Sequence, residues 1–80
     1  MNIINIRYNW PLFPASPLVR EDGSKEYVFL NLRCPCRVKL ANSISNVPSS
    51  AIVVIAPGTP YSVFAETKIT YDWMHVVGEV

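Results

Sequence analysis

Histidine is almost absent from this 80-residue chain, and His75 is its single representative. A catalytic metal site with open positions for substrate needs two or three imidazoles together with a carboxylate, so one histidine disfavours metal-dependent catalysis. Nucleophilic catalysis has equally little support, because no serine lies in an elbow motif. Glycine is scarce too, and Gly23, Gly58 and Gly78 form no phosphate-binding loop. We therefore expect no catalytic residue, no metal site and no cofactor.

Cysteine occurs only twice, as Cys34 and Cys36 on either side of Pro35. A disulfide between them would close a very short and strained ring, and no further cysteine is present to complete a zinc site. We expect two reduced thiols at a kink in a strand.

Long apolar runs and clustered charges are missing as well. No stretch approaches the roughly 20 residues that a membrane span requires, and the first residues lack the features of a signal peptide. A cytoplasmic location with no membrane partner is therefore expected. Seven basic and six acidic side chains are scattered along the chain and give a net charge of +1. This pattern provides no basic patch for nucleic acid, so DNA binding by a parent protein would lie outside these residues.

Apolar residues make up half of the chain, which is enough for the core of one folded domain. A chain of this length buries only about 60–65% of its unfolded surface and is marginally stable alone. Dimerisation or additional chain would therefore help to stabilise it.

Residues 52–56 form a continuous apolar run, IVVIA, that is rich in β-branched side chains. Such a run is typical of a core strand buried on both faces, since Val and Ile fit a pleated surface. Pro57 ends the strand and Gly58 is free to take a positive φ. The sequence therefore predicts a tight turn here, after which the chain reverses and pairs back.

Alternating apolar and polar residues predict half-buried strands at residues 26–33 and 36–40, with Pro35 at a bulge or corner between them. On this alternation four side chains face inward: Leu30, Leu32, Val38 and Leu40. Residues 20–25 predict a turn, and residues 43–46 are compatible with a short strand. Six or seven short strands without any helix-period stretch predict an all-β sandwich or barrel.

Residues 1–16 are expected to form an N-terminal arm ahead of a single β domain at residues 17–80. The start of the arm fits a strand, but its second half, together with Pro17, holds three of the seven prolines and is neither helix nor central strand. The side chains of Trp10 and Phe13 must be covered. They either lie on an open sheet edge or on the end of the core, or they close as a mobile lid over a ligand.

One strand near the end of the chain carries the candidate binding residues. Tyr71, Trp73 and His75 share one face by the period of two, and Asp72 and Met74 share the other. A sugar-sized ligand needs an aromatic surface and a few directed donors in a mostly dry pocket, which the first face is able to line. Simple core packing of Trp73 is the alternative, and His75 is taken as a structural histidine.

Two motifs in this order resemble a known family. Residues 55–61, IAPGTPY, and residues 71–78, YDWMHVVG, are similar to the end of the cupin-like effector-binding domain of AraC-type bacterial transcription regulators. Those domains commonly carry a Pro-Gly turn and, about ten residues later, a Tyr-Asp-Trp-x-His-like strand. Three earlier segments also resemble strands of these domains: RxxG at residues 20–23, YVFLNL at 27–32 and CPCRV at 34–38. The resemblance spans residues 17–78.

The resemblance implies an all-β, cupin-like jelly roll, or double-stranded β-helix barrel, that is incomplete alone or completed by dimerisation. It implies a sensor domain for a small-molecule effector such as a sugar, acting on DNA only through a helix-turn-helix domain outside this chain. The residues that match effector-contacting positions are Arg20, Val63, Tyr71 and Trp73. Val63 departs from the family pattern, because an aliphatic side chain donates no hydrogen bond. A homodimer is compatible with this reading.

Two further functions stay open. A metal-dependent cupin enzyme is disfavoured by the single histidine, since Tyr61 stands where such enzymes tend to place a histidine after the turn. A small non-enzymatic β domain used for assembly is the third interpretation. A stoichiometric bound transition metal would favour the enzyme, and saturable sugar binding would argue against the assembly domain.

Overall fold

The computed structural model describes residues 2–48 and 50–77, which form eight β-strands and no helix. The strands are β1 (Asn2–Leu12), β2 (Leu18–Arg20), β3 (Tyr27–Leu32), β4 (Cys36–Leu40), β5 (Ser43–Val47), β6 (Ala51–Ile55), β7 (Tyr61–Phe64) and β8 (Ile69–Val77). Within this part of the chain, no helix is long and apolar enough to cross a membrane. The all-β prediction is confirmed, with one strand more than the six or seven expected.

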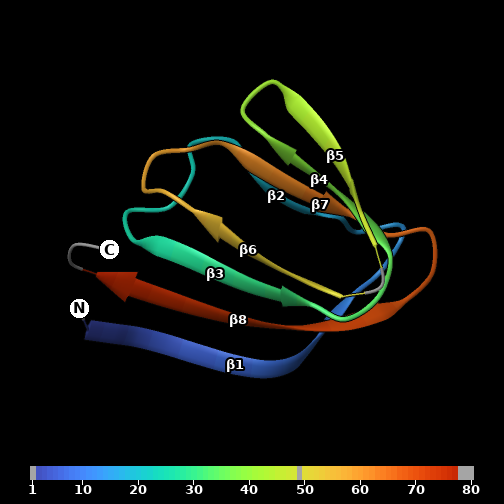
Figure 1. Cartoon of the computed structure of the whole chain (residues 1–80), viewed down its shortest axis with the longest axis horizontal. Helices are drawn as coiled ribbons and strands as arrows, with labels where there is room; N and C mark the ends of the chain where they lie inside the picture. Colours follow the sequence, from blue (N-terminus) through green and yellow to red (C-terminus); the bar gives the residue numbers. More distant parts are fainter. Residues whose placement is uncertain (1, 49, 78–80) are drawn as a thin grey trace.

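The strands build two antiparallel four-stranded sheets that face each other as a β-sandwich (Figure 1). The first sheet has the order β1-β8-β3-β6, and the second has the order β2-β7-β4-β5. Consecutive strands alternate between the sheets, except for β4 and β5, which form a hairpin. Each sheet is therefore assembled mainly from segments that are distant in the sequence.

The core lies between the sheets, where both supply their inward-facing side chains. Its buried members are Leu12, Val28, Leu30, Leu32, Cys36, Val38, Val47, Ile55, Tyr61, Val63, Ala65, Ile69 and Tyr71. The alternation predicted for β3 and β4 is confirmed, since Leu30, Leu32 and Val38 are almost fully buried and Leu40 is partly buried. No buried side-chain nitrogen or oxygen among the described residues lacks a hydrogen-bond partner.

The prediction that residues 52–56 are buried on both faces is wrong. β6 is an edge strand of the first sheet, and its residues alternate, with Ile52 71% exposed and Val54 47% exposed, whereas Ile55 is buried. The physical reason is that only the inner face of this sheet meets the second sheet. The described residues place no other layer over the outer face of β6.

The turn at Pro57 and Gly58 also differs from its prediction. Gly58 has the expected positive φ of 77°, but β6 pairs with β3 while β7 pairs with β2 and β4. The turn therefore carries the chain across to the other sheet instead of closing a hairpin. The turn at Pro57 and Gly58 also contacts the turn that precedes β3. The Gly58 N–H donates a hydrogen bond of 2.8 Å to the Ser24 carbonyl oxygen.

The segment expected as an arm is an edge strand up to Leu12. β1 pairs with β8, and this edge position tolerates Pro11, which has no N–H to donate. The pairing contains a β-bulge: Arg7 lies opposite Trp73 and Trp10 lies opposite Tyr71, so β1 advances three residues while β8 advances two. Asn9, in this bulge, has a positive φ of 53°.

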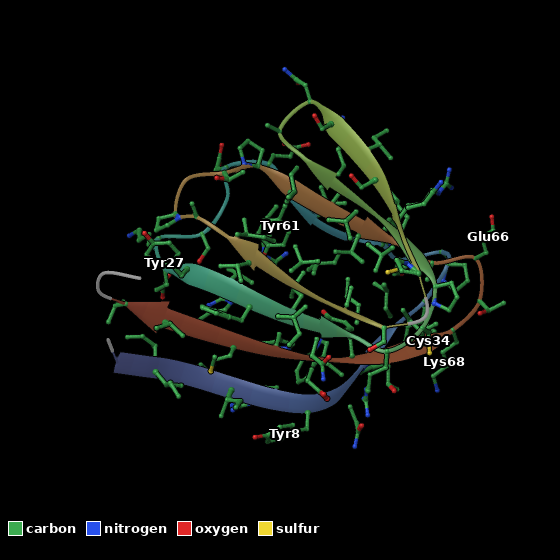
Figure 2. The ribbon with its side chains drawn as sticks, in the orientation of Figure 1. Tyr8, Tyr27, Cys34, Tyr61, Glu66 and Lys68 are labelled. Carbon is green, nitrogen blue, oxygen red and sulfur yellow. The ribbon has the colours of Figure 1, made fainter. Side chains whose placement is uncertain are left out.

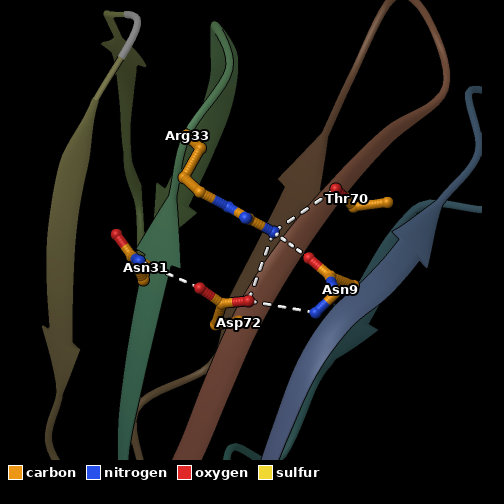
Figure 3. Close-up of polar contacts among 5 residues, drawn as sticks. All are labelled: Asn9, Asn31, Arg33, Thr70 and Asp72. Carbon is orange, nitrogen blue, oxygen red and sulfur yellow. Dashed lines mark hydrogen bonds and ion pairs between the residues drawn. The ribbon is translucent and has the colours of Figure 1, made fainter.

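Asp72 holds the bulge from the outer face of the first sheet (Figure 3). One carboxylate oxygen accepts the Asn9 backbone N–H at 3.0 Å and lies 3.2 Å from Arg33 Nη2, while the other accepts the Asn31 amide at 3.0 Å. The Asn9 N–H is the main cause of a lowered pKa of Asp72. Desolvation opposes it, and the Asn31 amide and the charge of Arg33 lower the pKa further. A single carboxylate thus connects β1, β8 and β3.

We expect Gly23→Ala to destabilise the protein more than Gly58→Ala. Both glycines have a positive φ, which costs a residue with a Cβ about 1–2 kcal/mol. A Cβ on Gly23 would also lie 2.7 Å from the Thr59 carbonyl oxygen, whereas a Cβ on Gly58 meets nothing within 4 Å. Overpacking of that kind adds about 1–3 kcal/mol. Urea unfolding measures the loss of unfolding free energy in each variant. Equal losses would contradict the close contact between Gly23 and the Thr59 carbonyl oxygen.

Stability should also depend on Asp72 in a pH-specific way. Because the folded state lowers the pKa of Asp72, its contribution is present above the unfolded value of about 3.9 and is lost as pH falls through the folded pKa. Asp72→Asn should therefore lower the melting temperature at pH 7, and the difference from the wild type should shrink below about pH 4. Asp22→Asn, at an exposed turn residue, is the matched control. A difference that stays constant down to pH 2.5 would refute this role.

Candidate functional site

A half-open cavity of about 120 Å³ lies between the two sheets. Five strands contribute to its wall, three from the first sheet and two from the second. The lining residues are Trp10, Leu18, Arg20, Val28, Leu30, Tyr61, Tyr71, Trp73 and His75. The cavity is therefore built only when both sheets are in place.

The aromatic wall of the cavity comes mainly from β8. Tyr71, Trp73 and His75 alternate along this strand and all line the cavity, which places them on one face as predicted. The rings of Trp73 and His75 lie 5.0 Å apart with a tilt of 50°. Trp10 meets Trp73 edge to face, at 5.7 Å and 80°, an arrangement that the quadrupoles of aromatic rings favour.

Trp10 reaches the cavity because of the bulge in β1. Paired residues of neighbouring strands point to the same face, so both Arg7 and Trp10 share the face of Trp73 and Tyr71 although they are three positions apart. In a regular strand, residues three apart point to opposite faces. The additional residue at the bulge thus turns Trp10 inward, against Trp73.

Two tyrosine hydroxyls, the Arg20 guanidinium and the His75 imidazole supply the polar groups. Tyr61, shown between the sheets in Figure 2, and Tyr71 are both about 4% exposed. Burial raises the pKa of each, and the repulsion between the two phenols raises that of Tyr71 further, while the nearby charge of Arg20 acts in the opposite direction. Both hydroxyls are therefore protonated at neutral pH. They can donate and accept hydrogen bonds, but they are poor metal ligands in this form.

The structure brings together three of the four residues named from the sequence. Arg20, at the end of β2, and Tyr71 and Trp73 on β8 line the same cavity. Val63 does not line it: it is 1% exposed in the core and pairs with Leu18 on β2 and with Val38 on β4.

Three further aromatic side chains of the lining were not predicted from the sequence as ligand-binding: Trp10, Tyr61 and His75. The period of two on β8 already places His75 beside Trp73, so its position was readable from the sequence. Tyr61 follows the turn and points inward with the same period as Val63 on β7. Trp10 was predicted only as a side chain of the arm that must be covered or that closes over a ligand. Its direction from β1 had no local signal, because it depends on the bulge.

A second hollow, of about 540 Å³, lies near the two cysteines and is less suited to chemistry. Cys34 and Cys36 are free thiols, and burial followed by the proximity of Cys34 raises the pKa of Cys36. A thiol held in its protonated form is a weak nucleophile. Across residues 2–48 and 50–77, no three His, Cys, Asp or Glu side chains are arranged to hold a metal ion.

The described residues thus define a β-sandwich with one aromatic cavity that combines neutral hydroxyls and a cation. No protein-family model and no curated protein matches this chain. Its function is accordingly inferred from the cavity and its chemistry.

We expect Tyr61 and Tyr71 to ionise above the ordinary tyrosine value of about 10, because burial raises both pKa values. An absorbance titration at alkaline pH should resolve two late phenols, and Tyr61→Phe and Tyr71→Phe should each remove one. The same shift affects stability. Because folding raises the pKa of both phenols, their contribution to the free energy of unfolding is complete below about pH 10 and is lost as pH rises through their pKa values in the folded state. Ionisation of Tyr61 and Tyr71 near pH 10, with circular dichroism still native, would contradict the burial of these hydroxyls.

Proposed function

We propose that this chain is a jelly-roll sensor domain that binds a small polyhydroxylated molecule, such as a monosaccharide, without covalent chemistry. The observation that carries the proposal is the convergence of Trp10, Trp73, Tyr61, Tyr71 and Arg20 on one half-open cavity. Aromatic faces pack against the C–H surface of a sugar ring, and hydroxyls and a guanidinium bond to its oxygens. No metal or cofactor takes part in this mechanism.

The order of the strands supports the jelly-roll part of the proposal. Eight antiparallel strands lie in two four-stranded sheets, consecutive strands mostly alternate between the sheets, and β1 lies beside β8. Jelly rolls, cupins among them, are eight-stranded double sheets built from two Greek keys. The resemblance of residues 55–61 and 71–78 to AraC-type effector domains points in the same direction.

The size of the cavity limits how the ligand sits. A dry cavity of about 150 Å³ is known to accept benzene, so about 120 Å³ encloses a fragment of similar size. A pyranose has about twice as many heavy atoms as benzene. We therefore propose that one face of the sugar lies on Trp73 while the remainder stands in the open mouth, beside Trp10 and Arg20.

The biological role that we propose is control of a DNA-binding domain outside this chain, in a cytoplasmic regulator of the AraC type. A ligand shifts a conformational equilibrium only when it binds the two states differently. Trp10 provides such a difference, because it belongs to the edge strand β1, which has β8 as its one partner among the described strands. Ligand contact with Trp10 would stabilise β1 in its docked position.

Tryptophan fluorescence provides a direct test. Trp10 and Trp73 are the two tryptophans of the chain and both line the cavity, so all indole emission reports on this site. A panel of monosaccharides and small polyols should contain at least one member that changes this emission saturably. Arg20→Met should weaken its binding at least tenfold, because a hydrogen bond to a charged group contributes about 1.5–3 kcal/mol.

The controls separate the site from general effects on the fold. Arg37→Met removes an exposed arginine on β4 that does not line the cavity, and it should leave affinity unchanged. Trp73→Ala should abolish binding while circular dichroism still reports β structure. Equal weakening by Arg20→Met and Arg37→Met would refute the assignment, as would a panel without any saturable ligand.

A further inference from the structure

The outer face of the first sheet is unusually apolar for a surface. The strand register aligns Ile6, Met74, Phe29 and Val54 in one row that crosses all four strands. Paired residues share a face of the sheet. Met74 follows Trp73 on β8 and so points to the other face. Because Trp73 faces the cavity between the sheets, the row with Met74 points away from the second sheet. Ile6 is 38% exposed and Val54 is 47% exposed.

A groove of about 230 Å³ lies on this face, and Tyr8 and Ile52 border it together with three members of the row. Tyr8 is 68% exposed, and Figure 2 shows it projecting from β1 away from the second sheet. Large apolar side chains clustered on one sheet face mark an interaction surface in soluble proteins.

The charges of the same face are neutralised within it. Among the residues that line the groove, the one ionisable acid or base other than tyrosine is Asp72, which pairs with Arg33 at 3.2 Å. Asn9, Asn31 and Thr70 complete this polar cluster (Figure 3). A face that is apolar and electrically balanced does not repel an identical copy of itself, which is what an isologous twofold contact requires.

The sequence of β6 supports the same conclusion. Its five residues, AIVVI, contain no charge, no polar side chain and no proline, which is the composition of a strand covered on both faces. The single chain covers only the inner one. Most edge strands carry charges or proline against unwanted pairing, and β6 carries neither.

We infer that two copies of this chain pack face to face through the outer surface of the first sheet. Four strands at about 4.8 Å spacing, with mean lengths of about 25 Å, present roughly 500 Å² per copy. A pair therefore buries on the order of 1,000 Å², the size that a specific interface should reach. The rows of Ile6, Met74, Phe29 and Val54 from the two copies form the dry centre of this interface, and the Asp72 cluster lies at its polar margin.

Sedimentation equilibrium of the wild-type chain should give twice the chain mass of 9.0 kDa at micromolar concentration. Ile52→Lys places a charge in the interface and should raise the dimer dissociation constant at least tenfold. Ile44→Lys is the matched control, because Ile44 is similarly exposed, at 64%, but lies on β5, an edge strand of the second sheet. This control should stay dimeric.

A second measurement covers the case in which a variant fails to fold. The melting temperature of a wild-type dimer should rise with protein concentration, because association stabilises the folded state by mass action. A wild-type chain that sediments at 9.0 kDa up to about 100 µM, or melts independently of concentration, overturns the inference. Equal dissociation by Ile52→Lys and Ile44→Lys overturns it as well.

Discussion

The bulged pairing of β1 with β8 is the constraint on which the cavity depends. An extra residue in an edge strand leaves a backbone N–H without a ladder partner, and here the Asp72 carboxylate accepts that of Asn9. The residue after it, Trp10, is thereby turned inward to meet Trp73 edge to face. One carboxylate on the outer face of the sheet thus supports the bulge that places Trp10 on its inner face.

β8 connects these two faces along its length. Tyr71 and Trp73 line the cavity, while Asp72 and Met74, between and after them, belong to the outer polar cluster and the outer apolar row. β8 lies between β1 and β3 in the first sheet. A displacement of β1 from β8 would therefore change both the cavity on the inner face and the apolar row on the outer face. In the proposed sensor, ligand binding inside the sandwich and association of copies outside it would therefore act through the same pair of strands.

Much of the strand pattern was readable from local sequence. The alternation of residues 36–40 predicted β4 with the bounds that the structure has, and Leu30 and Leu32 are buried as the period of two requires. The conformation of Gly58 was also predictable, since a Pro-Gly pair favours a positive φ at glycine. The destination of that turn was not, because strand alternation between sheets is a property of the whole chain.

The sequence by itself determined which residues are able to line a pocket. Tyr71, Trp73 and His75 share a face in any regular strand, because side chains alternate along it. Only the tertiary structure decided which of the inward residues reach a cavity: Val63 lies in the packed core, although it shares β7 with Tyr61. The exposure of β6 depended on the absence of a covering layer among the described residues. The inward direction of Trp10 depended on the bulge in β1. Local sequence specifies what a side chain can bury, whereas the partners that cover it come from segments far away in the chain.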